Sequence, residues 1–306
     1  MNRQRPQIHD FSHNSWRGPE IDPWEELSTT PSSGLENTTR TAKTWAGNTD
    51  VSTELMALRM LAVCAEGRDF ELLREGAALA SLPLELVEAD SAQRAAALLS
   101  GRSIDLVLVD SALSEPDQAR IAKAAREADN PAFVILLSGD LTHQKASASC
   151  ADAMTAKPRD AKAAKIMVDG CVQSRLPSRV LVVDDSATMR SIVKKILGAG
   201  HFPVQLADAS EGQAALDMLG QDAADIVFLD YNMPGLDGVE TLKALKRSKP
   251  DVRVVIMTSA NDESVATRAL DAGADAFLKK PFYPADVDKV IYGLFGLTPI
   301  APGKSL

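Results

Sequence analysis

The stretch Val180-Leu181-Val182-Val183-Asp184-Asp185-Ser186 leads an apolar run directly into two adjacent carboxylates. Such a run is typical of a buried parallel strand, and it predicts that both acids lie at the carboxyl end of that strand. Two carboxylates in one place repel each other unless a cation lies between them, and a hard divalent ion such as Mg²⁺ binds through oxygen. The stretch therefore predicts a parallel sheet with a divalent cation site at Asp184 and Asp185.

Three further predicted strands, each mainly apolar, end in polar side chains: 225–229 in Asp230, 254–257 in Thr258, and 276–278 in Lys279-Lys280-Pro281. In an open α/β sheet, functional groups gather at the carboxyl ends of the strands. We therefore expect the acids, the hydroxyl and a lysine ammonium group to meet at one edge of the sheet. This combination predicts a site for a metal ion and a phosphoryl group.

The alternation of strands and helices occurs twice along the 306 residues, a length that suits two domains. The earlier copy has a strand-then-acid run at 104–110, a strand-then-hydroxyl run at 133–138 and a Lys-Pro ending at 157–158. We predict an α/β protein with two tandem flavodoxin-like (βα)5 doubly wound parallel-sheet domains. They are expected over 54–174 and 178–298, close together because the join between them is short.

Residues 1–53 are rich in Ser, Thr, Asn, Pro and Gly without a helix or strand period, which predicts a disordered tail. All three tryptophans of the chain, Trp16, Trp24 and Trp45, lie in this tail. The acidic segment 22–27 could bind a partner as a short linear motif. The alternative is that the aromatic side chains fold back loosely on the domains.

The composition excludes several classes of protein. A net charge of −9 argues against general nucleic-acid binding. No apolar run approaches the roughly 20 residues needed to span a bilayer, so we expect no membrane insertion. The N-terminus lacks the apolar core of a signal peptide, which predicts a cytoplasmic protein. Cys64, Cys150 and Cys171 are widely spaced and odd in number, so reduced thiols are expected.

Residues 178–298 resemble the receiver domain of two-component response regulators, and most closely its small chemotaxis and cell-cycle types. The resemblance lies first in the strand-end residues and their spacing: Asp184, Asp185, Asp230, Thr258 and Lys280-Pro281. It extends to the turn at 232–238 and to the helix opening at 186–190. The motifs are specific as a set, whereas each alone is common in loops and turns.

This resemblance implies a role for each residue of the set. Asp230 would be the phospho-acceptor, and Mg²⁺ would be bound by Asp184, Asp185, Asp230 and the backbone carbonyl of Asn232. Lys280 would pair with a phosphoryl oxygen. Thr258 would be the switch hydroxyl and Phe277 the aromatic switch. The readout surface would then consist of a helix over 262–272, a strand over 274–278 and a helix over 284–295.

The first domain departs from the family pattern. Cys64 and Ala65 stand in the places of the two acids, whereas Asp110, Ser138 and Lys157 remain. A thiol and a methyl group cannot bind a hard cation. We predict a pseudo-receiver in which Asp110 and Lys157 form a salt bridge in a metal-free pocket. Cys64 is either a redox sensor or a small buried apolar residue.

The resemblance implies a histidine kinase or a histidine phosphotransferase as phosphodonor, and no enzymatic activity beyond the domain's own phosphorylation and dephosphorylation. No DNA-binding output domain is recognisable, so a downstream protein would bind a receiver face, the first domain or the Trp-bearing tail. One alternative is a phosphate sink that drains a shared kinase. Another is a scaffold that acts independently of phosphorylation. A homodimer through the last helix-strand-helix face also remains open.

Overall fold

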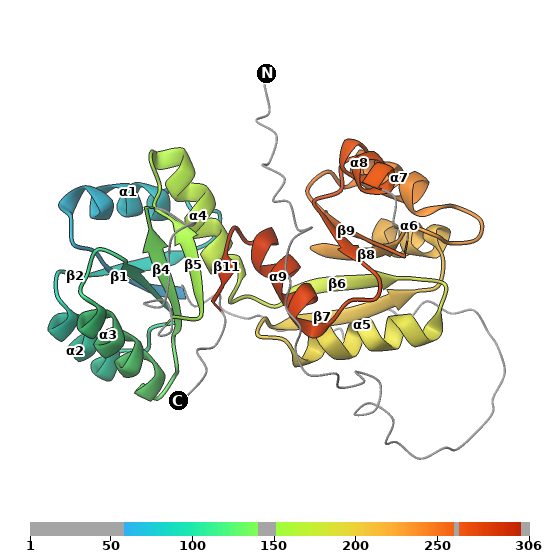
Figure 1. Cartoon of the computed structure of the whole chain (residues 1–306). Helices are drawn as coiled ribbons and strands as arrows, with labels where there is room; N and C mark the ends of the chain where they lie inside the picture. Colours follow the sequence, from blue (N-terminus) through green and yellow to red (C-terminus); the bar gives the residue numbers. More distant parts are fainter. Residues whose placement is uncertain (1–57, 140–150, 260–262, 301–306) are drawn as a thin grey trace, which may run out of the picture. The chain divides into compact units, whose positions relative to one another are not determined.

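The computed structural model describes residues 58–139, 151–259 and 263–300. Within them the chain forms two sheets with helices on both faces of each (Figure 1). The first domain consists of β1 (Leu58–Val63), α1 (Gly67–Ala78), β2 (Leu84–Ala89), α2 (Ala92–Gly101), β3 (Leu106–Asp110), α3 (Glu115–Glu127), β4 (Phe133–Ser138), β5 (Ala153–Ala156) and α4 (Ala161–Gln173).

The second domain has the same order of strands and, among the described residues, one further helix between its fourth and fifth strands. It consists of β6 (Ser178–Val183), α5 (Ala187–Ala199), β7 (Val204–Ala209), α6 (Gly212–Gln221), β8 (Ile226–Asp230), α7 (Gly238–Ser248), β9 (Arg253–Thr258), α8 (Glu263–Asp271), β10 (Ala276–Lys279) and α9 (Pro284–Leu294). A short strand, β11 (Thr298–Pro299), follows α9.

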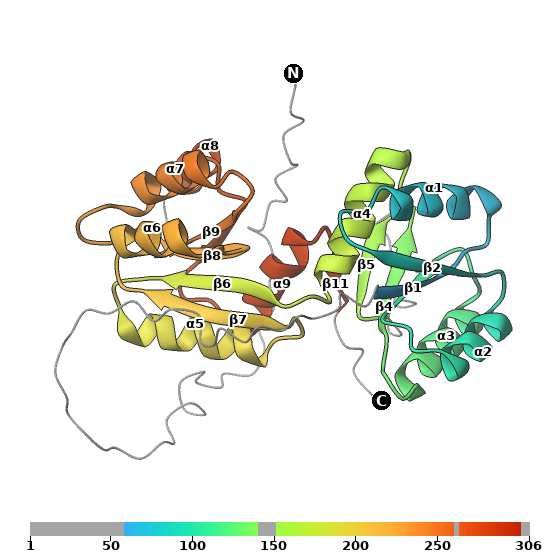
Figure 2. The ribbon, with the colours of Figure 1, turned by 180° about the vertical axis from the view of Figure 1, so that it is seen from behind.

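Both sheets have the strand order 2-1-3-4-5 of flavodoxin-like folds, namely β2-β1-β3-β4-β5 and β7-β6-β8-β9-β10. Neighbouring strands of each domain pair in parallel. In the first domain α1 packs beside α4 and α2 beside α3, on opposite faces of the sheet, and in the second α5 packs beside α9 and α6 beside α7 (Figure 2). The predicted fold class is therefore confirmed.

The central strands are apolar because helices cover both faces of each sheet. Every residue of β3 and β8 is buried. The helices present one apolar stripe each, such as Val193 and Leu197 of α5, both of which are buried. Helix α5 begins where the Ser186 hydroxyl accepts a hydrogen bond from the Met189 amide at 3.3 Å, which places a helix N-terminus directly after the acid pair.

The two sheets belong to one compact unit of the chain and share an apolar cluster. Phe133 of β4 lies 6.5 Å from Phe202 and 6.4 Å from Tyr292, measured between ring centroids. Phe202 and Tyr292 contact each other edge to face at 4.7 Å. Contacts of this kind bury large apolar surfaces in specific geometries. These contacts agree with the expectation that the short join keeps the two domains close together.

Strand β11 extends the sheet of the first domain although it follows the last helix of the second. It pairs antiparallel with β5, with Thr298 opposite Met154. Helix α4 approaches the same segment so closely that a Cβ at Gly170 would lie 2.2 Å from the Phe295 carbonyl oxygen. Tyr292 and Phe295 are both only 4% exposed. The carboxyl end of the predicted readout helix is thus buried at this junction, which the sequence analysis did not predict.

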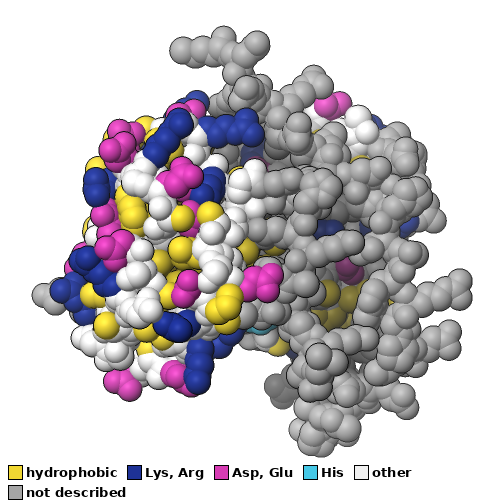
Figure 3. Space-filling view, turned by 60° about the vertical axis from the view of Figure 1, so that its left-hand side comes forward, with side chains coloured by type: hydrophobic (Ala, Val, Ile, Leu, Met, Phe, Trp, Pro, Cys, Tyr) yellow, Lys and Arg dark blue, Asp and Glu magenta, His cyan; other side chains and the backbone are white. Residues whose placement is uncertain are grey.

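The predicted tail over 1–53, including its three tryptophans, lies outside the described residues, as does Cys150. The predicted domain limits stay predictions. Within the described ranges, each helix is too short or too polar to span a lipid bilayer. On the face shown in Figure 3, basic and acidic side chains are interspersed and hydrophobic side chains are scattered among them.

Candidate functional site

The parallel pairing of β6 with β8 brings the acids together. Val183 pairs with Leu229, so Asp184 and Asp230 follow side by side at the carboxyl ends of neighbouring strands. Asp184 is 1% and Asp230 5% exposed, whereas Asp185 is exposed to solvent. One carboxylate oxygen from each of the three lies within 4.8 Å of the others. This is the only cluster of its kind in the part of the chain that the structure describes.

Lys280 brings a positive charge into the acid cluster from the loop after β10. Its Nζ lies 2.7 Å from Asp184 Oδ2 and 3.0 Å from Asp230 Oδ1. The lysine side chain is 16% exposed, so water screens these contacts only partly. The ammonium group therefore bridges the two buried carboxylates.

The site perturbs two ionisation equilibria. Burial raises the pKa of Asp230, and the negative charge of Asp184 adds to this effect, while the hydrogen bond from Lys280 works against it. Burial alone would lower the pKa of Lys280, but its hydrogen bonds to Asp184 and Asp230 outweigh burial and raise it. The Lys280 ammonium group is therefore held in its charged form.

Thr258 lies at the end of β9, where it is completely buried. Asp230 pairs with Met257 in the sheet register, so Thr258 follows one position beyond the acceptor. The Lys280 amide donates a hydrogen bond to the Thr258 carbonyl oxygen at 2.7 Å, which ties the loops after β9 and β10 together. Phe277 of β10 is half-buried and packs against the core on the face of α6 and α7. The switch roles of Thr258 and Phe277 stay predictions.

The turn after β8 packs tightly beneath the acceptor. The Asn232 backbone amide donates a hydrogen bond to the Asp230 carboxylate, which opposes the rise that burial causes in the pKa of that group. A Cβ at Gly238 would lie 2.4 Å from the Asp230 carbonyl oxygen, so only glycine fits at this first position of α7. The predicted role of the Asn232 carbonyl as a metal ligand stays a prediction.

The residues of this site fit a divalent cation. Three carboxylates at two strand ends are hard oxygen donors of the kind that Mg²⁺ prefers. Lys280 compensates only one of their three negative charges. The exposed carboxylate of Asp185 leaves the cluster open to solvent on one side. A cation bound by Asp184, Asp185 and Asp230 would balance the remaining charge.

In the corresponding site of the first domain, one lysine contacts two carboxylates. Lys157 Nζ lies 2.8 Å from Asp110 Oδ1 and 2.7 Å from Asp69 Oδ2. The Ala65 and Ala112 amides donate hydrogen bonds to the two oxygens of the Asp110 carboxylate at 3.1 and 2.9 Å. Asp110 is therefore completely buried and both of its oxygens have partners. The predicted pairing of Asp110 with Lys157 is present.

Asp69 belongs to this first site through a contact with Lys157 that the sequence did not predict. It lies in the first turn of α1, away from any strand end, so the strand-then-acid pattern could not find it. Burial alone would lower the pKa of Lys157, but its hydrogen bonds to Asp110 and Asp69 outweigh burial and raise it. Ser138, at the end of β4, is 2% exposed. The site is thus an ion-pair network of one lysine and two acids, in which Asp110 is buried and Asp69 is partly exposed.

The environment of Cys64 favours the structural interpretation of this residue. The side chain is 2% exposed and belongs to the core. Burial raises the pKa of its thiol to about 12, and the negative charges of Asp110 and Asp69 add to the effect. Redox-sensing cysteines need an accessible thiolate. Cys64 therefore packs as a small apolar residue.

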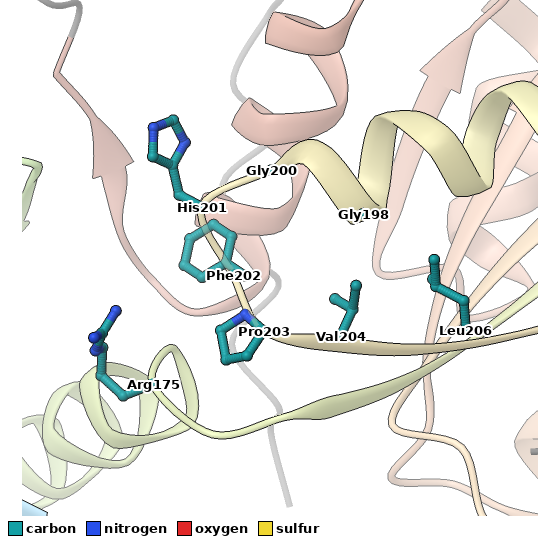
Figure 4. A pocket seen from close by; sticks show the side chains of 8 residues that line it. All are labelled: Arg175, Gly198, Gly200, His201, Phe202, Pro203, Val204 and Leu206. Carbon is teal, nitrogen blue, oxygen red and sulfur yellow. The ribbon is translucent and has the colours of Figure 1, made fainter. Parts of the chain in front are cut away.

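A cavity of about 560 Å³ lies away from the acids, at the amino end of β7 (Figure 4). Figure 4 shows Val204 and Leu206 side by side along the strand, with Phe202 and Arg175 nearby. The acid cluster lies at the opposite, carboxyl ends of the strands. The cavity and the acid cluster are therefore separate features, and none of the acids lines the cavity.

Comparison with known proteins identifies the class of this domain. The family model described as "Response regulator receiver domain" matches residues 180–292. Residues 180–292 therefore match the receiver-domain family, and the match includes every residue of the acid cluster together with Thr258 and Lys280.

Several known proteins are similar to part of this chain. The response regulator MprA of Mycolicibacterium vanbaalenii is 38% identical over 107 residues, which are 35% of this chain and 46% of the relative. The chain thus spans about half the length of the curated relatives it matches. Among solved structures, the chemotaxis protein CheY4 of Vibrio cholerae is 27% identical, with a TM-score of 0.36, over 39% of this chain and 98% of that one. A putative two-component system response regulator/GGDEF domain protein is 24% identical, with a TM-score of 0.46, over 78% of this chain and 98% of that one.

Proposed function

We propose that the second domain accepts a phosphoryl group on Asp230 and thereby switches the binding of a protein partner. The observation that carries this proposal is the position of Lys280, whose ammonium group lies within 3.0 Å of Asp230 and 2.7 Å of Asp184 beside an exposed third acid. The site thus combines a nucleophile with positive charge and a place for a cation. Phosphoryl transfer depends mainly on such positioning and charge neutralisation.

The reaction begins with a phosphohistidine of a histidine kinase or histidine phosphotransferase. A carboxylate oxygen of Asp230 attacks the phosphorus atom, and the bond from phosphorus to the imidazole nitrogen breaks. The imidazole leaves with the bonding electron pair and takes up a proton from solvent. The product on this chain is an acyl phosphate. The signal ends by hydrolysis: water attacks the same phosphorus and releases inorganic phosphate, which regenerates the Asp230 carboxylate.

The neighbouring residues stabilise the added charge. Asp184, Asp185, Asp230 and the carbonyl of Asn232 would hold Mg²⁺, which when bound neutralises charge on the transferring phosphoryl oxygens. Lys280 exchanges its contact with Asp230 for a phosphoryl oxygen, because a dianionic phosphoryl group at this place attracts the ammonium more strongly than a single carboxylate. Thr258 donates its hydroxyl proton to another phosphoryl oxygen, which draws the loop after β9 inward.

The output is a change of surface shape that a protein partner recognises. Movement of Thr258 frees space that the half-buried ring of Phe277 can enter, and Phe277 lies on β10 between α8 and α9. The exposed parts of α8, β10 and α9 are thus the readout surface. The first domain does not accept a phosphoryl group in this proposal, because Cys64 and Ala65 stand where the second domain has its acid pair and cannot bind a hard cation.

Incubation with acetyl phosphate tests this proposal. We expect a mass increase of one phosphoryl group in Mg²⁺, its absence in excess EDTA, and its loss on treatment with hydroxylamine, which cleaves acyl phosphates. Peptide mapping should locate the adduct on Asp230. An adduct that forms equally in EDTA, or that resists hydroxylamine, would contradict the proposed chemistry. The lifetime of the adduct separates signalling from a phosphate sink, which requires rapid self-hydrolysis.

A further inference from the structure

Arg190 links the loop that carries the acid pair to the neighbouring strand. The residue lies in the first turns of α5. Its Nη1 donates hydrogen bonds to the backbone carbonyl oxygens of Asp184 at 2.7 Å and Asp185 at 3.3 Å. Its Nε donates to Asp208 Oδ2 of β7 at 2.9 Å. One planar guanidinium group therefore ties together β6, α5 and β7 directly behind the acids.

Asp208, the residue of β7 that Arg190 contacts, is held in place by a second hydrogen bond. Asp208 is 15% exposed at its side chain and also accepts a hydrogen bond from Lys194 of α5. Burial alone would raise the pKa of Asp208, but the hydrogen bonds from Lys194 and Arg190 outweigh it and lower the pKa. The carboxylate is thus charged, partly buried and held by two cations. It fixes the guanidinium of Arg190 in the plane that reaches the two carbonyl groups.

The first domain provides an internal comparison. Ala62 pairs with Glu88 in its sheet, as Val182 pairs with Asp208 in the second, so Glu88 occupies the place of Asp208. Arg74 of α1 bonds both oxygens of Glu88 at 2.7 and 2.9 Å. The ion pair between helix and second strand is therefore present in both domains.

The bond to the acid-bearing loop is present only in the second domain. Phe70 stands in the same place relative to Cys64 as Arg190 stands relative to Asp184. Its ring is partly buried and packs against the apolar core. A side chain without donors cannot hold the loop carbonyls, and the loop of that domain carries Cys64 and Ala65 in place of acids. The tie and the acid pair thus occur together and are absent together.

From this geometry we infer that Arg190 is a positioning residue for the cation site, holding the backbone of Asp184 and Asp185 so that both carboxylates stay turned toward Asp230. This inference rests on the proposed function, because it assumes that the acids bind a cation. A residue that orients metal ligands through their backbone typically alters metal affinity by about 10–100-fold when it is replaced. Asp185 depends most on the tie, because its side chain is exposed and has little packing to fix it.

The direction in which cation affinity changes when Arg190 is replaced distinguishes a positioning role from a purely electrostatic one. Arg190 places a positive charge near the acids, so its removal by charge alone would tighten cation binding. Positioning predicts the opposite. We expect Arg190→Met to weaken the binding of Mn²⁺, which takes the same oxygen ligands as Mg²⁺, by about 10-fold or more. Arg190→Lys keeps the charge but cannot fork to two carbonyls and a carboxylate, so it should also weaken Mn²⁺ binding.

Lys194→Met is the matched control, because it removes the same charge beside Asp208 without a contact to the loop. Its Mn²⁺ affinity should equal or slightly exceed that of the wild type. Free Mn²⁺ is measured by its electron paramagnetic resonance signal, without phosphodonor, and circular dichroism checks that each variant is folded. Mn²⁺ binding by Arg190→Met as tight as in the wild type, while phosphorylation of Asp230 persists, would overturn this inference alone. Failure of the wild type to bind Mn²⁺ or to form the adduct would overturn the proposed function with it.

Discussion

Replacing Lys280 by methionine is expected to slow the phosphorylation of Asp230 by about 10²–10³-fold at saturating Mg²⁺. The ammonium group contacts Asp184 and Asp230 before the reaction and is the nearest lysine charge to the acceptor. Methionine has a similar length and no charge, so it preserves most of the packing while removing the stabilisation of the phosphoryl oxygens. The rate of mass increase in acetyl phosphate measures the effect.

Lys157→Met is the matched control for this variant. Lys157 contacts Asp110 in the first domain as Lys280 contacts Asp230 in the second. Its replacement should leave the phosphorylation rate of Asp230 at the wild-type value. Equal slowing by both substitutions would indicate a general loss of structure, and unchanged phosphorylation of Lys280→Met would contradict the role given to this lysine.

Lys157→Met is itself expected to destabilise the first domain by about 3–5 kcal/mol, because it leaves two carboxylates without their cation in a buried place. The side chain of Asp110 is completely buried and that of Asp69 only 14% exposed. Hydrogen exchange of the amides of β1 and β3, measured against denaturant, reports the free energy of opening of this domain. Adding Asp110→Asn to Lys157→Met removes one of the two repelling charges and should restore part of the lost stability of the first domain.

Magnesium distinguishes the two domains in the same experiment. In Lys280→Met, added Mg²⁺ should stabilise the second domain, because a cation that binds only the folded state shifts the equilibrium toward it. In Lys157→Met, Mg²⁺ should not stabilise the first domain, because Cys64 and Ala65 offer no hard oxygen side chain. Restoration of the first domain by Mg²⁺ would contradict its assignment as a metal-free pocket.

The fold could be predicted from the sequence because the central strands of these parallel sheets are buried on both faces. Runs such as 180–183 and 225–229 have no other plausible environment, and their alternation with amphipathic helices determines the order of the layers. The meeting of Asp184 with Asp230 also followed, since the carboxyl ends of parallel strands share one edge of the sheet. These inferences needed only the sequence period and the direction of the strands.

Other features depend on which faces of separate elements meet, and the sequence period does not contain that information. Arg190 reaches Asp208 only because α5 packs on the face of β7 from which this carboxylate projects. Asp69 reaches Lys157 from a helix turn. Strand β11 has two residues, one of them proline, so no alternating pattern marks it. Its pairing with β5 is decided by the contact between domains.

The most direct test of the account compares intact masses of the wild type, Asp230→Ala and Asp110→Ala after incubation with acetyl phosphate and Mg²⁺. The second domain is expected to be the sole phospho-acceptor, because the first has Cys64 and Ala65 in place of the acid pair. We expect one added phosphoryl group on the wild type and on Asp110→Ala, and none on Asp230→Ala. Phosphorylation of Asp230→Ala together with its loss in Asp110→Ala would contradict the account and reverse the roles of the two domains.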